Sequence, residues 1–284
     1  MSGLLFGTGG IPNSTPQRST VAGIERIKEL GLGCMEVEFV QGVTMSIATA
    51  ESVKSTAEEN GIVLSCHAPY FINLNSHEVD KVKSSRKRLL QTAHIAQACG
   101  ARNIIFHAAF YMDDPPDVAY EAVKKQLSET LAEIHSETSN VILRPEVTGK
   151  PTQFGTVEEI LRLCQELPGM LPCIDLAHWH ARTGANSYEE AIDVFKQVEK
   201  ALGKKAIHDM HFHFSGIKYG ERGEISHLQL EKSDLNYREL LRAMADYGIE
   251  GLVICESPRE IMEDDALLLQ NTYRKMIKTK AVSH

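Results

Sequence analysis

The sequence contains no hydrophobic run that approaches the roughly 20 residues needed for a membrane-spanning helix. Its first ten residues, MSGLLFGTGG, lack the basic segment and the apolar stretch of a secretory signal. No low-complexity linker or block of like charges interrupts the chain. We therefore expect a cytoplasmic protein without membrane contact, built as one domain over residues 1–284, a length that buries a large core without disulfides.

Paired cysteines are missing as well. None of the six cysteines forms a CxxC pair. Four of them, Cys34, Cys66, Cys173 and Cys255, lie in apolar runs that are typical of strands. We expect buried, reduced thiols in the core.

The chain also lacks a phosphate-binding glycine loop. Gly7-Thr8-Gly9-Gly10 follows the first apolar run, but no GxGxxG or GxxxxGK[ST] pattern continues from it. An open, doubly wound sheet usually carries such a loop after its first strand. Its absence disfavours that fold and indicates an ordinary turn.

Positive charge is in the minority. The chain has 30 Lys and Arg residues against 38 Asp and Glu, so its formal net charge is −8. This balance argues against a protein whose whole surface binds nucleic acid, although it leaves room for a local basic patch.

A repeated unit does fill the chain, in which a short apolar run precedes an amphipathic helix. The predicted strands are Leu4–Gly7, Cys34–Phe39, Ile62–His67, Asn103–His107, Val141–Glu146, Leu171–Asp175, Asp209–Phe214 and Gly251–Glu256. The predicted helices are Val21–Leu30, Ile47–Asn60, Val79–Cys99, Asp117–Ser136, Thr156–Glu166, Tyr188–Leu202, Asn236–Tyr247 and Arg259–Lys278. Eight strands alternating with eight helices predict an α/β fold, a closed (β/α)8 TIM barrel.

Metal-ligating residue types gather at the ends of the predicted strands. Strands three to eight carry, at or near their carboxyl ends, His67, His107, Glu146, Asp175 with His178, His211, and Glu256. The loop after strand seven adds Glu224 and His227. A closed barrel brings these ends to one rim, and buried imidazoles and carboxylates are costly unless they are paired or bind cations. We therefore predict a divalent metal site at this rim, for zinc, with manganese or magnesium as the alternatives.

Strand parity separates the predicted ligands from their neighbours, because successive residues point to opposite sides. Cys66 and Cys255 face away from the predicted site. Cys173 faces its side but lies about 6–7 Å deeper, so we assign it to the core. His213 shares a side with His211, and it either ligates metal or hydrogen-bonds to a ligand.

Arg144 shares a side with Glu146 and lies one layer deeper. A buried arginine needs a partner. We expect that partner to be Glu36 or Glu38 on the second strand, in a structural ion pair.

From the third strand onward, the sequence resembles the endonuclease IV family of apurinic/apyrimidinic endonucleases, within the xylose-isomerase-like group of barrels. The segments that carry the resemblance are His67-Ala68-Pro69-Tyr70-Phe71-Ile72-Asn73-Leu74, Cys173-Ile174-Asp175-Leu176-Ala177-His178, Met210-His211 and Glu256-Ser257-Pro258.

The resemblance implies a site for up to three zinc ions. The first would be held by His67, His107 and Glu146. The second would share Glu146 and add Asp175, His211 and Glu256. The third would have His178 and His227, with Glu224 as its carboxylate.

Two positions depart from the family pattern. The family places an aspartate two residues before the last histidine, where this chain has Ile225, with Glu224 one residue further back. The family also has a basic, aromatic loop after strand two that deforms DNA. The matching stretch here, residues 38–45, has no Arg or Lys.

The activity implied by the resemblance is cleavage of double-stranded DNA on the 5′ side of an abasic site, by a monomer in base-excision repair. Glu146 and Glu256 would be catalytic, as the bridging ligand and as a ligand and proton acceptor. Tyr70, Asn73 and His213 would contact the substrate.

Two other interpretations stay open. A sugar isomerase or epimerase of the same barrel group would need only one divalent ion, bound by Glu146, Asp175, His211 and Glu256, and would act on a small sugar. The acidic charge and the absent basic loop favour it, whereas the additional histidines favour the nuclease. A non-catalytic binder of damaged DNA or metal is the third interpretation.

Overall fold

The computed structural model describes residues 3–137 and 140–282, so both ends of the predicted domain lie outside the described residues. Eight parallel strands form one strongly curled sheet in the spatial order β6-β4-β3-β2-β1-β12-β9-β8. Their bounds are β1 (Leu4–Gly9), β2 (Cys34–Glu38), β3 (Val63–His67), β4 (Asn103–Phe106), β6 (Ile142–Pro145), β8 (Ile174–Asp175), β9 (Met210–Phe214) and β12 (Gly251–Cys255).

Backbone contacts between β6 and the segment before β8 close this sheet into a barrel. Two isolated parallel bridges join Leu143 to Met170 and Glu146 to Cys173. The Cys173 N–H also donates to the Pro145 carbonyl at 3.0 Å. Because all eight strands are parallel, their carboxyl ends meet at one rim, and the predicted TIM barrel is confirmed.

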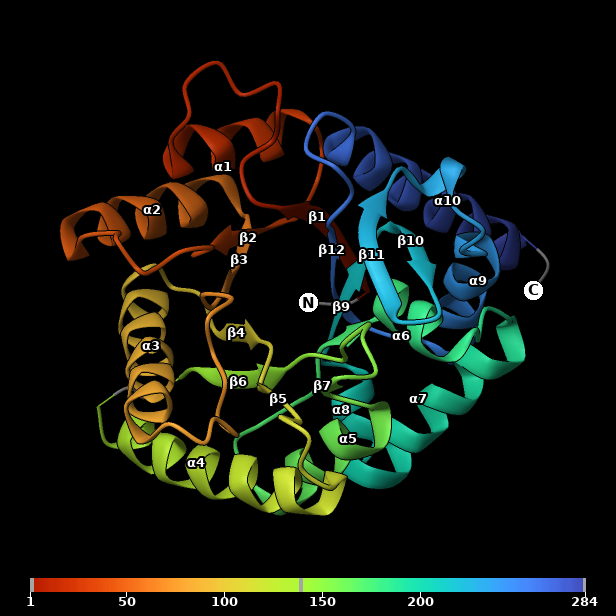
Figure 1. Cartoon of the computed structure of the whole chain (residues 1–284). Helices are drawn as coiled ribbons and strands as arrows, with labels where there is room; N and C mark the ends of the chain where they lie inside the picture. Colours follow the sequence, from red (N-terminus) through yellow and green to blue (C-terminus); the bar gives the residue numbers. More distant parts are fainter. Residues whose placement is uncertain (1–2, 138–139, 283–284) are drawn as a thin grey trace.

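The helices are α1 (Thr20–Glu29), α2 (Ile47–Asn60), α3 (Val79–Ala98), α4 (Pro116–Glu137), α5 (Val157–Glu166), α6 (Leu176–Thr183), α7 (Tyr188–Leu202), α8 (Lys204–Ile207), α9 (Tyr237–Tyr247) and α10 (Met262–Val282), with a 3-10 turn η1 (Leu230–Lys232). The long helices surround the strands as an outer ring, whereas the short α6 lies inside that ring, next to β9 (Figure 1). Among the described residues, no helix combines the length and apolar character that crossing a membrane requires.

Helix α7 shows how local sequence produces these elements. Ser187 and Glu190 form a capping box, in which each side chain accepts a hydrogen bond from the backbone N–H of the other. The buried side chains recur every three or four positions, at Ala191, Val194, Phe195 and Val198. This spacing places them on the one face of the helix that packs against the barrel.

Three features of the strands differ from the sequence prediction, and the helices α6 and α8 were not predicted. The sixth strand is shorter than Leu171–Asp175, because Pro172 has no N–H to donate to a sheet. The connection after β9 is a hairpin of β10 (Gly216–Gly220) and β11 (Gly223–Leu228) instead of a loop. A second small pair, β5 (Ala109–Phe110) with β7 (Gln153–Phe154), lies above the same rim. The six cysteines are free and buried, as expected.

The predicted partner of Arg144 was wrong. Arg144 is fully buried, and its Nη2 donates to Asp209 Oδ1 at 2.7 Å. Its Nε donates to Asn103 Oδ1 at 2.9 Å, and its Nη1 donates to the Pro172 carbonyl at 3.0 Å. Asp209 immediately precedes β9, so the guanidinium points to the amino-terminal end of the barrel and away from Glu36 and Glu38, which belong to the site described next.

Candidate metal centre

A cavity of about 670 Å³ opens at the carboxyl ends of the strands. Its acidic and imidazole lining consists of Glu36, Glu38, His67, His107, Glu146, His178, Glu224, His227 and Glu256. Three cationic side chains also line it, those of Arg18, Lys150 and Arg259. The structure thus brings residues from distant parts of the chain to one rim.

Glu146 lies at the centre of this group. Its Oε2 is 3.1 Å from His67 Nε2 and 3.0 Å from His107 Nε2. Its Oε1 is 3.1 Å from His178 Nδ1 and 3.3 Å from His213 Nδ1. Burial by itself would raise the pKa of Glu146, but the charges of His107 and His213 hold it well below its usual range. An ionised carboxylate therefore faces four imidazoles.

Two histidines are held in the orientation that metal ligands adopt. His67 Nδ1 lies 2.7 Å from the carbonyl oxygen of Ala68, and His227 Nδ1 lies 2.8 Å from that of Glu256. In each case the Nδ1–H donates to the carbonyl, which fixes the ring and turns Nε2 towards the cavity. Ligating histidines commonly use their second nitrogen in this way.

A second set of donor atoms lies beside the first, all within 4.8 Å of one another, from Glu146, Asp175, His213 and Glu256. Asp175 and His213 are paired across β8 and β9, so they lie at the same level of the barrel. His211, which we predicted as the ligand, lies two residues lower, and its Nε2 is 3.1 Å from Glu36. Residues two apart on a strand lie about 6–7 Å apart, so His211 lies that far below the level of Asp175. We therefore place His213, and not His211, in the proposed set.

The third set comes from α6 and β11. Asp175 accepts a hydrogen bond from the His178 N–H at 2.7 Å, which caps α6, and its other oxygen lies 3.1 Å from His178 Nδ1. His178 Nε2 is 3.4 Å from Glu224 and 3.5 Å from His227 Nε2.

A β-bulge lets Glu224 take part although it stands three residues before His227. In the hairpin, Ser226 pairs with Lys218 and Glu224 pairs with Tyr219, so Ile225 is the extra residue. Residues three apart on a regular strand point to opposite sides, and one extra residue restores a common side. The bulge thus compensates for the departure in spacing.

The environment fits cations. Among residues 3–137 and 140–282, Glu146 Oε1, Asp175 Oδ2 and both ring nitrogens of His213 are buried and find no hydrogen-bond partner, because their close neighbours are not aligned for hydrogen bonds. Unpaired polar atoms in the interior are costly, and ions bound between them would remove that cost. Mixed imidazole and carboxylate donors suit zinc, and also manganese.

The two other predicted substrate contacts have different surroundings. Tyr70 lies at the mouth of the cavity, half exposed, with its ring centroid 5.6 Å from that of His67. Asn73 does not line the cavity. Its Oδ1 accepts hydrogen bonds from the N–H groups of Asn75 and Phe110, so it holds the rim loop together. A contact between Asn73 and substrate stays a prediction, and with the amide oxygen engaged it would be made through the amide nitrogen.

Two acidic residues of β2 belong to the site and were not predicted there. Glu36 is fully buried, and its Oε1 lies 2.9 Å from His213 Nε2. Glu38 lines the cavity, and burial raises its pKa to about 8, although the charge of His67 lowers it. The available signal was Glu36-Val37-Glu38, because two acidic residues on one side of an apolar strand are seldom buried without partners.

Metal binding by the metal-free protein should release protons and strengthen as the pH rises. Burial by itself lowers the pKa of His67, but its hydrogen bond with Glu146 and the charge of Glu38 raise it to about 10. Below that pH the ring is protonated, so a metal ion must displace a proton from Nε2. For each proton that the metal displaces, the apparent metal affinity rises about tenfold per pH unit below the pKa of the group.

Calorimetric zinc titrations between pH 6 and pH 8, in buffers of different ionisation enthalpy, measure the number of protons released. The variant His67→Asn should release fewer protons than the wild type. The surface variant His94→Asn, whose ring pairs with Glu137 at 2.8 Å, serves as the matched control and should release as many as the wild type. An affinity that does not change with pH would contradict this expectation.

Sequence comparisons point to one broad family. A family model of xylose isomerase-like TIM barrels matches residues 24–276. An uncharacterized protein of Methanocaldococcus jannaschii is 42% identical over 275 residues, which cover 96% of this chain and 98% of that protein. A probable endonuclease 4 of Mycobacterium leprae is 25% identical over 249 residues, with 84% and 93% covered.

Structural comparisons find two chemistries on this fold. Endonuclease IV from Thermus thermophilus superposes with a TM-score of 0.75 at 20% identity, covering 96% of this chain and 99% of that one. D-psicose 3-epimerase with D-tagatose, from Clostridium cellulolyticum, superposes with a TM-score of 0.67 at 13% identity, covering 95% and 99%. At these identities the likeness is one of fold, so the site must decide the function.

Proposed function

The chain belongs to the xylose isomerase-like TIM barrel family, and from that premise we propose that it is a zinc-dependent apurinic/apyrimidinic endonuclease. It would cleave double-stranded DNA on the 5′ side of an abasic site and leave a 3′-hydroxyl, as part of base-excision repair. The proposal includes up to three zinc ions and a cytoplasmic monomer with residues 1–284 as one domain.

The observation that carries the proposal is the presence of three overlapping sets of donors. The first set is His67, His107 and Glu146, with His178 close by. The second is Glu146, Asp175, His213 and Glu256, and the third is His178, Glu224 and His227. An enzyme that binds one ion has no need of the first and third sets. Several ions side by side suit in-line displacement at a phosphodiester.

Divalent ions bound here would supply a water that ionises near neutral pH and would neutralise charge on the phosphate. Glu146 and Glu256 would have different roles. Glu146 is shared between the sets and fixes their spacing. Glu256, with 15% of its side chain exposed, faces the cavity and can accept a proton.

The rim would position the substrate. Tyr70 offers a half-exposed ring at the mouth of the cavity, against which the distorted abasic strand can pack. Arg18, Lys150 and Arg259 line the same cavity and can contact phosphates. An abasic nucleotide has no base to unstack, so turning it into the cavity costs less than flipping an intact one.

A nicking assay on a duplex with a single abasic site tests this proposal. Zinc-loaded protein should cut 5′ to the lesion, chelator should abolish cutting, and added zinc should restore it. An undamaged duplex of the same sequence is the control. Metal analysis should find close to three zinc ions per chain. A zinc-loaded protein that leaves the abasic duplex intact would contradict the proposal, and tight binding without nicking would indicate a damage sensor.

A sugar isomerase or epimerase is the second proposal, and Glu38 favours it. Its carboxyl group lies beside His67, and its Oε1 is buried without a hydrogen-bond partner in the part of the chain that the structure describes. Such a group suits a hydroxyl-bearing ligand better than a phosphate. The segment 38–45 at this side of the cavity has no Arg or Lys. One manganese or magnesium ion per chain, together with turnover of a ketose sugar, would favour this function over the nuclease.

A further inference from the structure

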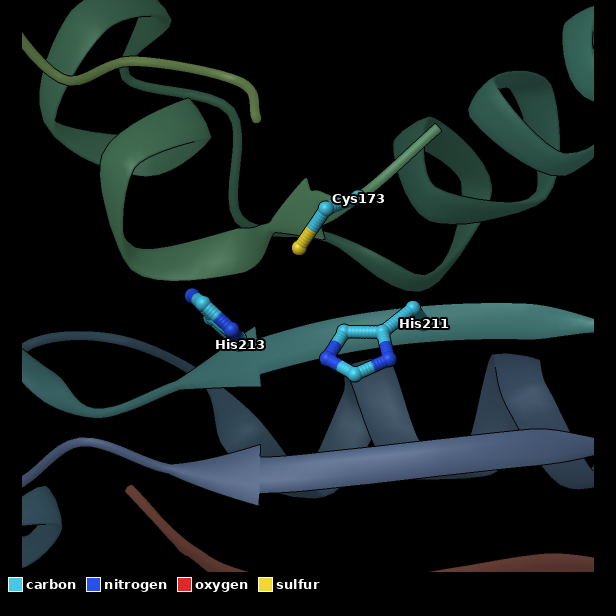
Figure 2. Close-up of side chains that lie close together, drawn as sticks. All are labelled: Cys173, His211 and His213. Carbon is cyan, nitrogen blue, oxygen red and sulfur yellow. The ribbon is translucent and has the colours of Figure 1, made fainter. Parts of the chain in front are cut away.

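A second group of metal-ligating side chains lies below the floor of the cavity. Cys173 precedes β8 by one residue, and His211 and His213 stand on β9. Figure 2 shows the Cys173 sulfur directed towards the two imidazole rings. One donor atom from each of the three residues lies within 4.8 Å of the others. The three side chains therefore enclose a space of the size that a single cation occupies in a protein site.

The group is completely enclosed. Cys173, His211 and His213 are all 0% exposed. Within the described residues, His211 Nδ1 and both ring nitrogens of His213 have no hydrogen-bond partner. A thiol offers one weak donor, so it cannot satisfy all of these nitrogens. Unpaired nitrogens in a dry interior are costly. The candidate metal centre around Glu146, called the rim centre below, also contains buried polar atoms that lack aligned hydrogen bonds to the residues described.

The carboxylate of Glu36 lies against both imidazole rings of this group. Its Oε2 lies 3.1 Å from His211 Nε2, and its Oε1 lies 2.9 Å from His213 Nε2. Oε1 is also buried and has no aligned hydrogen bond with any residue that the structure describes. These separations match those around Glu146 at the rim, where His67 and His107 lie 3.1 and 3.0 Å away.

We propose that Cys173, His211 and His213, with the Glu36 carboxylate beside both rings, form a further, buried binding site for a thiophilic divalent cation such as zinc. Thiolate with imidazole is a donor set that prefers zinc. One thiolate and one carboxylate balance the double charge of the ion, so the loaded site carries no net charge in the interior. Because the site is enclosed, the ion enters as the chain folds and stabilises the barrel.

The two rings of β9 connect this site to the rim centre. His213 has Nε2 beside Glu36 and Nδ1 beside Glu146 and Glu256, at 3.3 and 3.4 Å. A neutral imidazole ligates through one nitrogen, so His213 faces both centres and binds the ion of one of them at a time. His211 belongs to the buried site only, which explains why this histidine lies two residues below the rim.

Sulfur distinguishes the buried site from the rim, because the rim ligands include no cysteine. Protein produced with cobalt in place of zinc should show a near-ultraviolet thiolate-to-cobalt charge-transfer band. Without a cation, burial raises the pKa of the Cys173 thiol, so the sulfur stays protonated and gives no such band. Cys173→Ser should remove the band. Cys66→Ser is the matched control, since Cys66 is equally buried but faces away from the site, and it should retain the band.

X-ray absorption at the zinc edge of the wild type gives an answer that does not depend on a variant folding. After chelator has removed the rim ions, the remaining zinc should show about one sulfur neighbour at about 2.3 Å. Wild-type protein without a thiolate band and without a sulfur neighbour would overturn the proposal, as would a band that survives in Cys173→Ser. Neither readout involves DNA or sugar, so this result and the nicking assay can fail independently.

Discussion

Glu146→Gln is expected to lower metal-dependent turnover by about a thousandfold and to reduce the metal content of the purified protein. Glu146 is 1% exposed, and its two oxygens lie within 3.3 Å of four imidazole nitrogens. A neutral amide keeps the volume but removes the negative charge that the proposed ions share. Losing several kcal/mol of charge stabilisation in the transition state corresponds to about three powers of ten in rate.

Metal analysis by mass spectrometry, together with the rate of nicking at saturating zinc, measures the effect. Glu224→Gln is the matched comparison, because its carboxylate belongs to the third set and lies 3.4 Å from His178. That variant should lose one ion at most and retain more activity. If Glu146→Gln binds the full complement of metal as tightly as the wild type, Glu146 is not the shared ligand.

Arg144→Met should cost about 3 kcal/mol of unfolding free energy without changing the metal content. Arg144 is fully buried and donates to Asp209, Asn103 and the Pro172 carbonyl. Methionine fills a similar volume but leaves these acceptors unpaired, and removing one partner of a buried pair typically costs about 3–5 kcal/mol. We take the lower end, because 27% of the Asp209 side chain stays exposed and water can reach it.

Arg102→Met is the control for this variant, since Arg102 Nη1 contacts the same carboxylate at 2.9 Å but the arginine is 56% exposed. An exposed ion pair contributes less than about 1 kcal/mol. Urea unfolding of both variants in the metal-loaded state compares the two losses. If both variants lost the same unfolding free energy, the buried ion pair of Arg144 would contribute no more to stability than the exposed ion pair of Arg102.

Much of the fold could be predicted from local sequence alone. Strand and helix bounds follow from apolar periodicity and from capping residues, which act within a few positions along the chain. The misses were local in cause as well. Pro172 shortens β8 because it lacks an N–H. The segment expected to be a loop is a hairpin, in which the extra residue Ile225 forms a bulge.

The candidate ligands could be predicted only in outline. Residue type and position at strand ends selected His67, His107, Glu146, Asp175 and Glu256, because every parallel strand ends at the same rim. The choice between His211 and His213 depends on the register of β9 against β8, which pairs Asp175 with His213. Register is a relation between two strands. Both candidates are histidines on β9, so the sequence of β9 alone does not decide between them.

By itself the sequence determined the alternation of elements, the parallel barrel and the end of the barrel at which the polar residues meet, because periodicity and chain direction are properties of single segments. Only the tertiary structure decided at which level each side chain lies. It placed Arg144 with Asp209, Glu36 with His211 and His213, and Cys173 beneath the cavity floor. The physical reason is that depth in a barrel is set by the stagger between neighbouring strands, and a shift of two residues moves a side chain from the rim into the core.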